Sequence, residues 1–538
     1  MHNFFISSTA RLSTHLAPKY GMTKKTKYLG PTPRHVGRAD RSAARTGLLA
    51  ALFVIMLIAV LGALTSAPSL SVPRLSLALV LASCVLALQC AYRATGRRPV
   101  NWLSIELCFM LPFFVVHFGY ILYWLIGHPP FRQLLWVSAV AGDGSHRVCF
   151  ATMTSAAGLA AFAIGFNLLS DRLDRPLAAP PNERTLLAKW KRAGAVAICI
   201  GFSCAVVVAA SLGPSALEGR YKQSETGSLI LNYVLLLSTT STVAGTAMST
   251  LSTTRLHGKL QLVNGTLLLV YLQVFAFLVQ GDRNLALSVF AIIAVAYSES
   301  VKPISLRKLV VFVLAASFLF AVVGVGRRSP RRTIPSFLDT VFEERESIQW
   351  DSTIRELSYS AAALYAATAY VPEKHDFFRG RLMFQEALGI IPFSRRVFVT
   401  RRLLEGGPRQ EQTSSLLLTW VIVGSFGSGG KGTTSVADIY VNFGLPGVVL
   451  GLLLVGLACK ATQQRARAAG SIIWLSLYCI LVPQAAYMAR ATILGLLITQ
   501  VLWPTVVIAL FSVFLGLARP GRERTKQQAP LLATYLVP

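Results

Sequence analysis

The chain has 538 residues, of which 54% are hydrophobic and only 14% are charged, and its mean hydropathy is +0.56. A soluble protein needs roughly a quarter of charged residues to cover its surface, so this composition excludes an ordinary set of soluble domains. The formal net charge of +29 would suit a nucleic-acid-binding protein, but the basic residues lie between long apolar runs. The composition therefore indicates a membrane protein that binds no nucleic acid.

Twelve apolar runs are long enough, or nearly so, to cross a bilayer, and in lipid such runs must be helices. Nine come first, at residues 47–66, 75–92, 103–126, 148–170, 193–212, 229–248, 262–279, 284–297 and 309–326. Three more follow, at residues 439–458, 471–488 and 492–517. The last three runs have poorly defined ends and the eighth run is short, so the number of spans lies between eleven and fourteen. We therefore expect an all-α polytopic membrane protein with about 12 transmembrane helices, nine within residues 47–326 and three within 437–517.

Positive charge predicts the orientation of these helices, because lysine and arginine concentrate on the cytoplasmic side. With the N-terminus inside, thirty lysines and arginines fall in the inner loops and tails, and seven in the short outer loops. Both termini are therefore expected in the cytoplasm, as a basic tail at residues 1–46 and a second tail at 518–538. The first tail has no short apolar core, so no cleaved signal peptide is expected. Met22 is an alternative start.

Residues 327–436 form one long polar stretch between the ninth and tenth runs, and the charge pattern places it outside. A loop of this size is usually functional. Apolar residues recur at helical spacing in residues 335–350, 354–370 and 381–391, so we expect a large, partly helical extracytoplasmic loop. A transporter built from two six-helix halves would carry its long loop centrally, and this loop does not lie there.

Two arginines stand at tight outer turns between apolar runs, Arg283 and Arg490. Arginine at the bilayer edge is costly unless it is paired or reaches the interface, so each is an interfacial anchor, a salt-bridge partner or a functional residue. Guanidinium groups hold phosphate through paired hydrogen bonds. A phosphate site and an anchor are about equally compatible with the sequence.

Glu106 and His117 lie eleven residues apart in the third apolar run, and therefore on nearly the same face of a helix. Ionisable groups inside a membrane are functional candidates, although Glu106 stands near the inner end, where it can reach the headgroups. In the outer loop Arg395 and Arg396 form a basic pair. They suit a solvated face or anionic headgroups as well as a substrate.

Two stretches make the chain resemble the Wzy-type O-antigen polymerases, which join oligosaccharide repeat units in bacterial envelopes. Residues 432–447 read GTTSVADIYVNFGLPG, similar to the acidic–Tyr–Asn–Phe–Gly entry to a late span in that family. Residues 389–392 read GIIP and precede Arg395 and Arg396, similar to a basic segment late in the family's large outer loop. Arg283 and Arg490 also fit the family's pattern.

The resemblance implies glycosyl transfer at the outer face of the bacterial inner membrane. The donor is then a growing glycan on undecaprenyl pyrophosphate, and the acceptor is one lipid-linked repeat unit. Arginines suit the departing pyrophosphate, and a carboxylate or histidine suits the proton of the acceptor hydroxyl. The proton-accepting candidates are Asp438, His375, Asp376 and Glu386. The candidates for substrate and pyrophosphate binding are Arg283, Arg490, Arg395, Arg396, Tyr440 and Asn442.

Asp438 also suits a purely structural role, because an aspartate directly before an apolar run caps a helix. The sequence contains no cluster with metal-ligand spacing, so we expect a metal-independent reaction without a cofactor. A chain-length regulator and a lipid-linked glycan flippase are expected partners.

Three other functions are compatible with the sequence: a polysaccharide or O-antigen ligase, a glycan flippase without chemistry, and a structural partner of an assembly complex. The sugars, the linkage and the oligomeric state do not follow from the sequence.

Overall fold

The structure is a computed structural model. It describes residues 38–66, 70–95, 101–127, 147–169, 183–213, 229–262, 264–279, 282–326, 334–344, 352–391, 394, 409–424, 432–469 and 471–515. The chain divides into two units, residues 1–43 and 44–538. Of the first unit the structure describes only the start of helix α1, so the fold below is that of the second unit.

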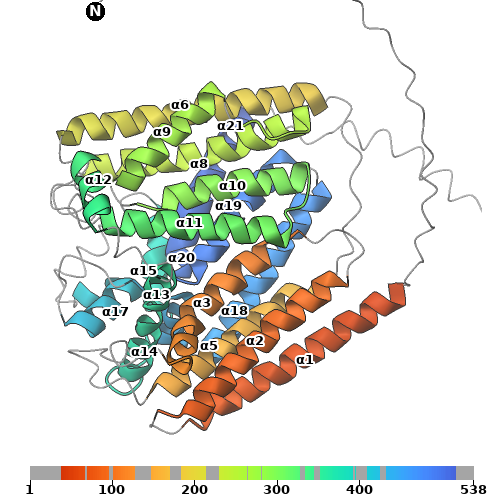
Figure 1. Ribbon diagram of the computed structural model, residues 1–538, viewed down its shortest axis with the longest axis vertical. Coiled ribbons are helices and arrows are strands. Elements are labelled where there is room, and N and C mark those ends of the chain that lie inside the picture. Colours follow the sequence, from red (N-terminus) through yellow and green to blue (C-terminus); the bar gives the residue numbers. More distant parts are fainter. Residues whose placement is uncertain are drawn as a thin grey trace, which may run out of the picture. The chain divides into compact units, whose positions relative to one another are not determined.

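Every regular element in the described ranges is a helix (Figure 1). The first nine apolar runs form α1 (Arg38–Leu64), α2 (Val72–Ala94), α3 (Ile105–Leu125), α5 (Val148–Leu168), α6 (Glu183–Leu212), α8 (Leu229–His257), α9 (Gly265–Val279), α10 (Asn284–Ser300) and α11 (Leu306–Gly326). The last three form α18 (Ser435–Ala469), α19 (Ile472–Met488) and a continuous run of α20 (Ile493–Leu496), the π-helical η6 (Leu497–Leu502) and α21 (Trp503–Phe514). All twelve apolar runs are therefore helical.

Within the described part of the chain, nine helices are long and apolar enough to cross a membrane. The other three expected spans, α9, α10 and α19, are apolar but have only 15 to 17 residues. The all-helical, multi-pass fold is thereby confirmed, and the number of twelve spans stays a prediction.

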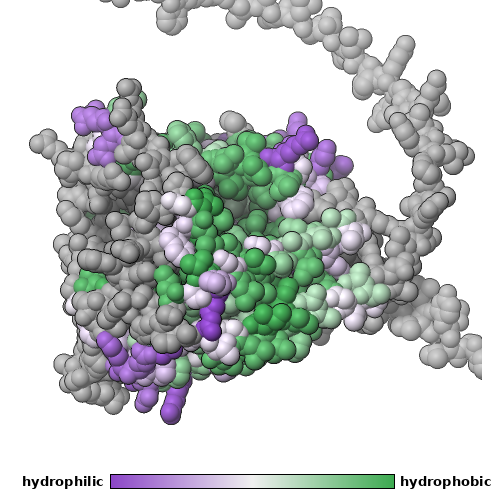
Figure 2. Space-filling model, turned by 60° about the horizontal axis from the view of Figure 1, so that its bottom comes forward, coloured by the Kyte–Doolittle hydropathy of each residue, from purple (hydrophilic) through white to green (hydrophobic). Residues whose placement is uncertain are grey.

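The surface of these helices is apolar, as a lipid-facing surface must be. Large side chains such as Val311, Leu314 and Phe318 on α11 and Leu510 on α21 are each more than 60% exposed. Figure 2 shows a broad hydrophobic area on one face, with the most hydrophilic residues mainly toward its edges. Such a large apolar surface is unfavourable in water and favourable in the hydrocarbon core of a bilayer.

Helix α5 is the most buried of the spans, because α18 lies directly against it. Two glycines allow the close approach: a Cβ at Gly165 would lie 2.0 Å from the carbonyl oxygen of Leu453, and one at Gly456 would lie 2.2 Å from that of Phe162. In lipid there is no hydrophobic driving force between helices. Small residues allow two helices to approach closely, and van der Waals packing then stabilises the crossing. The two helices therefore touch backbone to backbone.

The region between α11 and α18 contains α12 (Ile334–Glu343), α13 (Ser352–Ser358), α14 (Ala361–Tyr370), α15 (Arg381–Ala387), η4 (Leu388–Ile390), η5 (Arg409–Gln412) and α17 (Ser414–Val423). In Figure 1 the α-helices of this set gather at one end of the long helices, on the left. The single helix expected over residues 354–370 is wrong in detail. The helix breaks at Tyr359 and Ser360, and α13 and α14 are separate elements.

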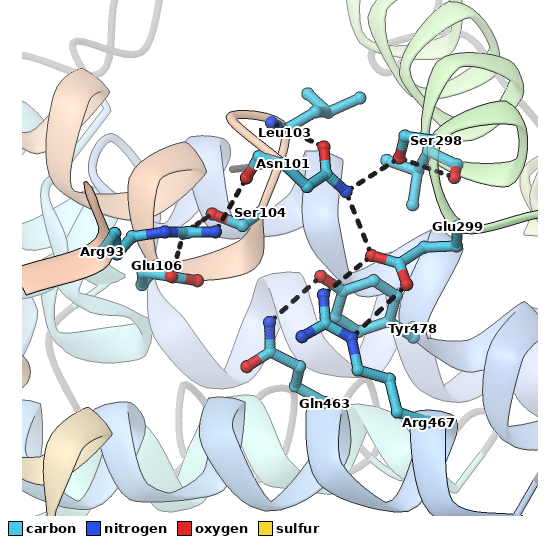
Figure 3. A network of polar contacts seen from close by, with 11 residues as sticks. Arg93, Asn101, Leu103, Ser104, Glu106, Ser298, Glu299, Gln463, Arg467 and Tyr478 are labelled. Atoms are coloured by element: carbon cyan, nitrogen blue, oxygen red, sulfur yellow. Dashed lines mark hydrogen bonds and ion pairs between the residues drawn. The ribbon is translucent and has the colours of Figure 1, made fainter. Parts of the chain in front are cut away.

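A polar network joins α2, α3, α10, α18 and α19 at the other end of α10 and α18 (Figure 3). The Arg93 guanidinium donates to the Glu106 carboxylate and, at 2.7 Å, to the carbonyl oxygen of Asn101. The Asn101 amide donates to Glu299 at 3.2 Å, and Arg467 donates to Glu299 at 2.9 Å. Since α10 begins beside α13 and ends in this network, the loop helices and the network lie at opposite ends of the bundle.

Candidate functional site

Arg283 and Arg490 meet at one carboxylate. Arg283 directly precedes α10, and its Nη1 lies 2.8 Å from Oε2 of Glu356 on α13. Arg490 stands in the turn after α19, and its Nη2 lies 3.9 Å from Oε1 of the same Glu356. Two arginines that are more than 200 residues apart in the sequence are thus brought together beside a helix of the loop region.

The two arginines differ in their surroundings. The side chain of Arg283 is 13% exposed, and it fits beside α11 because Gly324 has no side chain. A Cβ at Gly324 would lie 2.9 Å from Nη2 of Arg283. The side chains of Arg490 and Glu356 are 40% and 42% exposed. The guanidinium of Arg283 is therefore fixed in place, whereas that of Arg490 is accessible to water.

Asp438 lies in the first turn of α18 and is completely buried. Its Oδ1 accepts a hydrogen bond of 2.5 Å from the Ser414 hydroxyl on α17, and its Oδ2 accepts one of 3.2 Å from the backbone N–H of Ile493. Both oxygens thus already have donors from two other elements. This is the geometry of a residue that holds three segments together.

Tyr440 and Asn442 lie two and four residues further along α18, and both are buried. The Tyr440 hydroxyl donates to the carbonyl oxygen of Val371 at 3.3 Å, and the carbonyl oxygen of Asn442 accepts from the backbone N–H of Arg379 at 2.9 Å. Their contacts therefore fasten the segment after α14 onto α18. The Asn442 amide also donates to the carbonyl oxygen of Asp438 at 2.8 Å.

Glu386 on α15 reaches the same turn as Asp438, the one that follows α19. Its Oε2 accepts a hydrogen bond of 3.2 Å from the backbone N–H of Gly495. Ile493 and Gly495 follow Arg490 by three and five residues, so the contacts of Glu356, Asp438 and Glu386 all fall on one short stretch, within about 20 Å of chain. The structure thus brings together Arg283, Arg490, Asp438 and Glu386 from the sequence analysis.

His375 and Asp376 lie in the segment between α14 and α15. The His375 ring stacks on Phe378 with 4.3 Å between ring centroids, and its Nε2 lies 3.5 Å from Oε1 of Glu411. Asp376 is exposed. Burial, and secondarily the Glu411 charge, raise the pKa of the neighbouring Tyr370, so its hydroxyl stays protonated and able to donate. This cluster combines a water-accessible imidazole with a carboxylate.

Four other candidates have different outcomes. Arg395 and Arg396 lie outside the described residues. His117 is buried in the bundle, where its Nδ1 lies 3.2 Å from the Ser155 hydroxyl. Glu106 belongs to the network of Figure 3, at the end of the bundle away from Arg283 and Arg490.

Glu356 was not among the residues expected from the sequence. It is one carboxylate in an amphipathic stretch, 73 residues from Arg283, and no motif marks it. The only signal was indirect: two arginines at the membrane edge required a counter-charge, and the expected loop helices hold six acidic residues, of which Glu356 is one.

The family model described as O-antigen polysaccharide polymerase Wzy matches residues 48–520. No curated protein and no solved structure matches the chain.

Proposed function

The chain belongs to the O-antigen polysaccharide polymerase Wzy family, and on that basis we propose that Arg283 and Arg490 hold the pyrophosphate of its lipid-linked substrate. The family assignment confirms the resemblance found in the sequence. It makes the protein a membrane polymerase that joins lipid-linked oligosaccharide repeat units, and nothing favours a ligase or a flippase.

The meeting of the two arginines at one carboxylate carries the proposal. A carboxylate and a phosphate offer guanidinium groups the same kind of partner, an anion with at least two oxygens in one plane. Arginines that converge on Glu356 can therefore converge on a phosphate. Since glycosyl transfer releases a charged pyrophosphate, groups that neutralise it lower the barrier most.

The reaction then proceeds by exchange at the anomeric carbon of the donor glycan. The acceptor hydroxyl oxygen forms a bond to that carbon, and the bond from the carbon to the pyrophosphate oxygen breaks. The electron pair leaves with the pyrophosphate, facing Arg283 and Arg490. The hydroxyl proton passes to a base of the protein.

Among the expected bases, His375 is best suited to receive that proton. Its ring is accessible, and its Nε2 lies 3.5 Å from Oε1 of Glu411. Asp376 is exposed and next in the chain. The side chains of Asp438 and Glu386 are buried and accept backbone hydrogen bonds, so we assign them to positioning the turn that carries Arg490.

The lipid is undecaprenyl pyrophosphate, the membrane is the bacterial inner membrane, and both termini lie in the cytoplasm. The loop region 327–436 faces outward. A flippase supplies the repeat units, a chain-length regulator acts on the product, and the transfer needs no metal ion.

The test is polymer growth by the purified full chain on lipid-linked repeat units. Arg283→Lys and Arg490→Lys keep the charge but lose the planar fork, so each should lower the rate by roughly a hundredfold. Arg465→Lys is the matched control, because Arg465 lies over Trp474 at the other end of α18. Wild-type growth by both variants would return the two arginines to the role of anchors. Loss of growth in EDTA would overturn the metal-independent reaction.

A further inference from the structure

Glu356 lies between the two arginines to which the proposed function assigns the pyrophosphate. We infer that Glu356 and the lipid pyrophosphate compete for the same two guanidinium groups. In this inference, which rests on the proposed function, the carboxylate is displaced when substrate binds. It returns to the arginines as the polyprenyl pyrophosphate product leaves, and its competition for the guanidinium groups speeds that release.

The contacts of Glu356 resemble those that a phosphate would make. Each of its two carboxylate oxygens faces a different arginine, Oε2 toward Arg283 at 2.8 Å and Oε1 toward Arg490 at 3.9 Å. A bound pyrophosphate needs the same N–H groups for its own oxygens. Both anions cannot use them at once.

Charge decides which anion stays. Glu356 supplies one negative charge to two positive ones, whereas a pyrophosphate diester supplies two. With the pyrophosphate bound, the guanidinium groups are neutralised, and a carboxylate at the same distance is only repelled by the phosphates. The exchange is therefore favourable for a pyrophosphate and less so for a monophosphate.

Glu356 is also the partner that is able to leave. Its side chain is 42% exposed, so the carboxylate can turn into water without being buried alone. Arg283 is 13% exposed and enclosed beside Gly324, so it stays in place. The short helix α13 is itself fastened to α3, because the Ser358 hydroxyl donates to the carbonyl oxygen of Val115 at 2.8 Å. A rotation of the Glu356 side chain is therefore sufficient.

The experiment measures binding of farnesyl pyrophosphate, a short polyprenyl pyrophosphate, to the purified full chain in nanodiscs. Glu356→Gln keeps the shape and removes the charge, and Glu356→Ala removes the side chain. Both should bind about tenfold more tightly than wild type and release the ligand more slowly. Glu373→Gln is the matched control: Glu373 pairs with Arg147 and is 39% exposed, so its loss removes a similar charge from a different ion pair.

The outcomes separate the inference from the proposed function. If Arg283→Lys and Arg490→Lys bind the probe as wild type does, the arginines are not the pyrophosphate site, and the proposed function fails. If these variants bind weakly but neither Glu356 variant binds more tightly, only the competition is overturned. Equal tightening by Glu373→Gln also overturns it, because the effect would then be one of net charge.

Discussion

The carboxylate of Asp438 accepts a hydrogen bond of 3.2 Å from the backbone N–H of Ile493, and so joins the start of α18 to the turn before α20. The residues are 55 positions apart in the sequence. Because Arg490 stands in the same turn, the position of its guanidinium depends on a buried carboxylate that does not touch it.

Asp438→Asn should retain polymer growth within about threefold of wild type, because an amide can satisfy both contacts. Its oxygen can accept from Ile493, and its NH₂ can donate to the Ser414 hydroxyl. Asp438→Leu should lose growth at least tenfold, since it leaves two buried donors without partners, at about 1–3 kcal/mol each.

The measurement is the initial rate of polymer growth at matched protein abundance. A base cannot be replaced by an amide, so a loss of a hundredfold or more in Asp438→Asn would restore Asp438 as the proton acceptor.

Labelling with a membrane-impermeant maleimide should distinguish the two ends of the bundle. A cysteine at Tyr359, in the exposed turn between α13 and α14, should react in right-side-out vesicles. A cysteine at Thr95, exposed at the end of α2, should react only in inside-out vesicles. The unmodified chain, with its native cysteines, is the control. The reverse pattern would place the loop region in the cytoplasm and remove the outward-facing reaction.

Arg93→Met should destabilise the folded protein by about 3–5 kcal/mol, because it leaves the buried Glu106 carboxylate without its cation. Adding Glu106→Gln should recover part of this loss. Thermal unfolding in detergent measures both effects. Arg465→Met is the comparison, since its guanidinium is exposed over Trp474 and its loss should cost less than about 1 kcal/mol. Equal shifts in Arg93→Met and Arg465→Met would show that the network of Figure 3 adds little to stability.

Gly456→Ala should disturb the contact between α5 and α18, because the added methyl group would lie 2.2 Å from the carbonyl oxygen of Phe162. We expect a loss of about 1–3 kcal/mol, or poor assembly in the membrane. Gly265→Ala tests the same change where nothing lies within 4 Å, and it should be neutral or slightly stabilising. Monodispersity and melting temperature of the two variants give the comparison, and an unaffected Gly456→Ala would contradict the close packing.

The sequence was sufficient for the long helices because one physical quantity, the length of an apolar run, decides them. It was less informative in the loop region, where helices are short and tertiary contacts set their ends. Helix α17 was not expected, although Thr413 marks its start: the Thr413 side chain accepts from the backbone N–H of Leu416. The break between α13 and α14 has no comparable sequence signal that we recognise.

Site residues were predictable from the sequence where the chemistry of the side chain alone marks them. They were not predictable where their role depends on contacts that form only in the folded chain. Arg283 and Arg490 stand out because arginine at a membrane edge needs a partner. Asp438 stood out equally, but its burial and its two hydrogen-bond donors depend on α17 and α20, which the motif does not reveal. Glu356 became visible only through its contacts with both arginines.

The contacts that converge on the turn after α19 also affect the order of folding during biosynthesis, because they join segments that are made at different times. Glu386 precedes its partner Gly495 by 109 residues, and ribosomes add roughly 5–20 residues per second. The loop helices thus wait for about five to twenty seconds before the segment that completes them is made. A chaperone or the translocation machinery has that interval in which to protect them, and a nascent chain stopped after α18 would leave them without their final support.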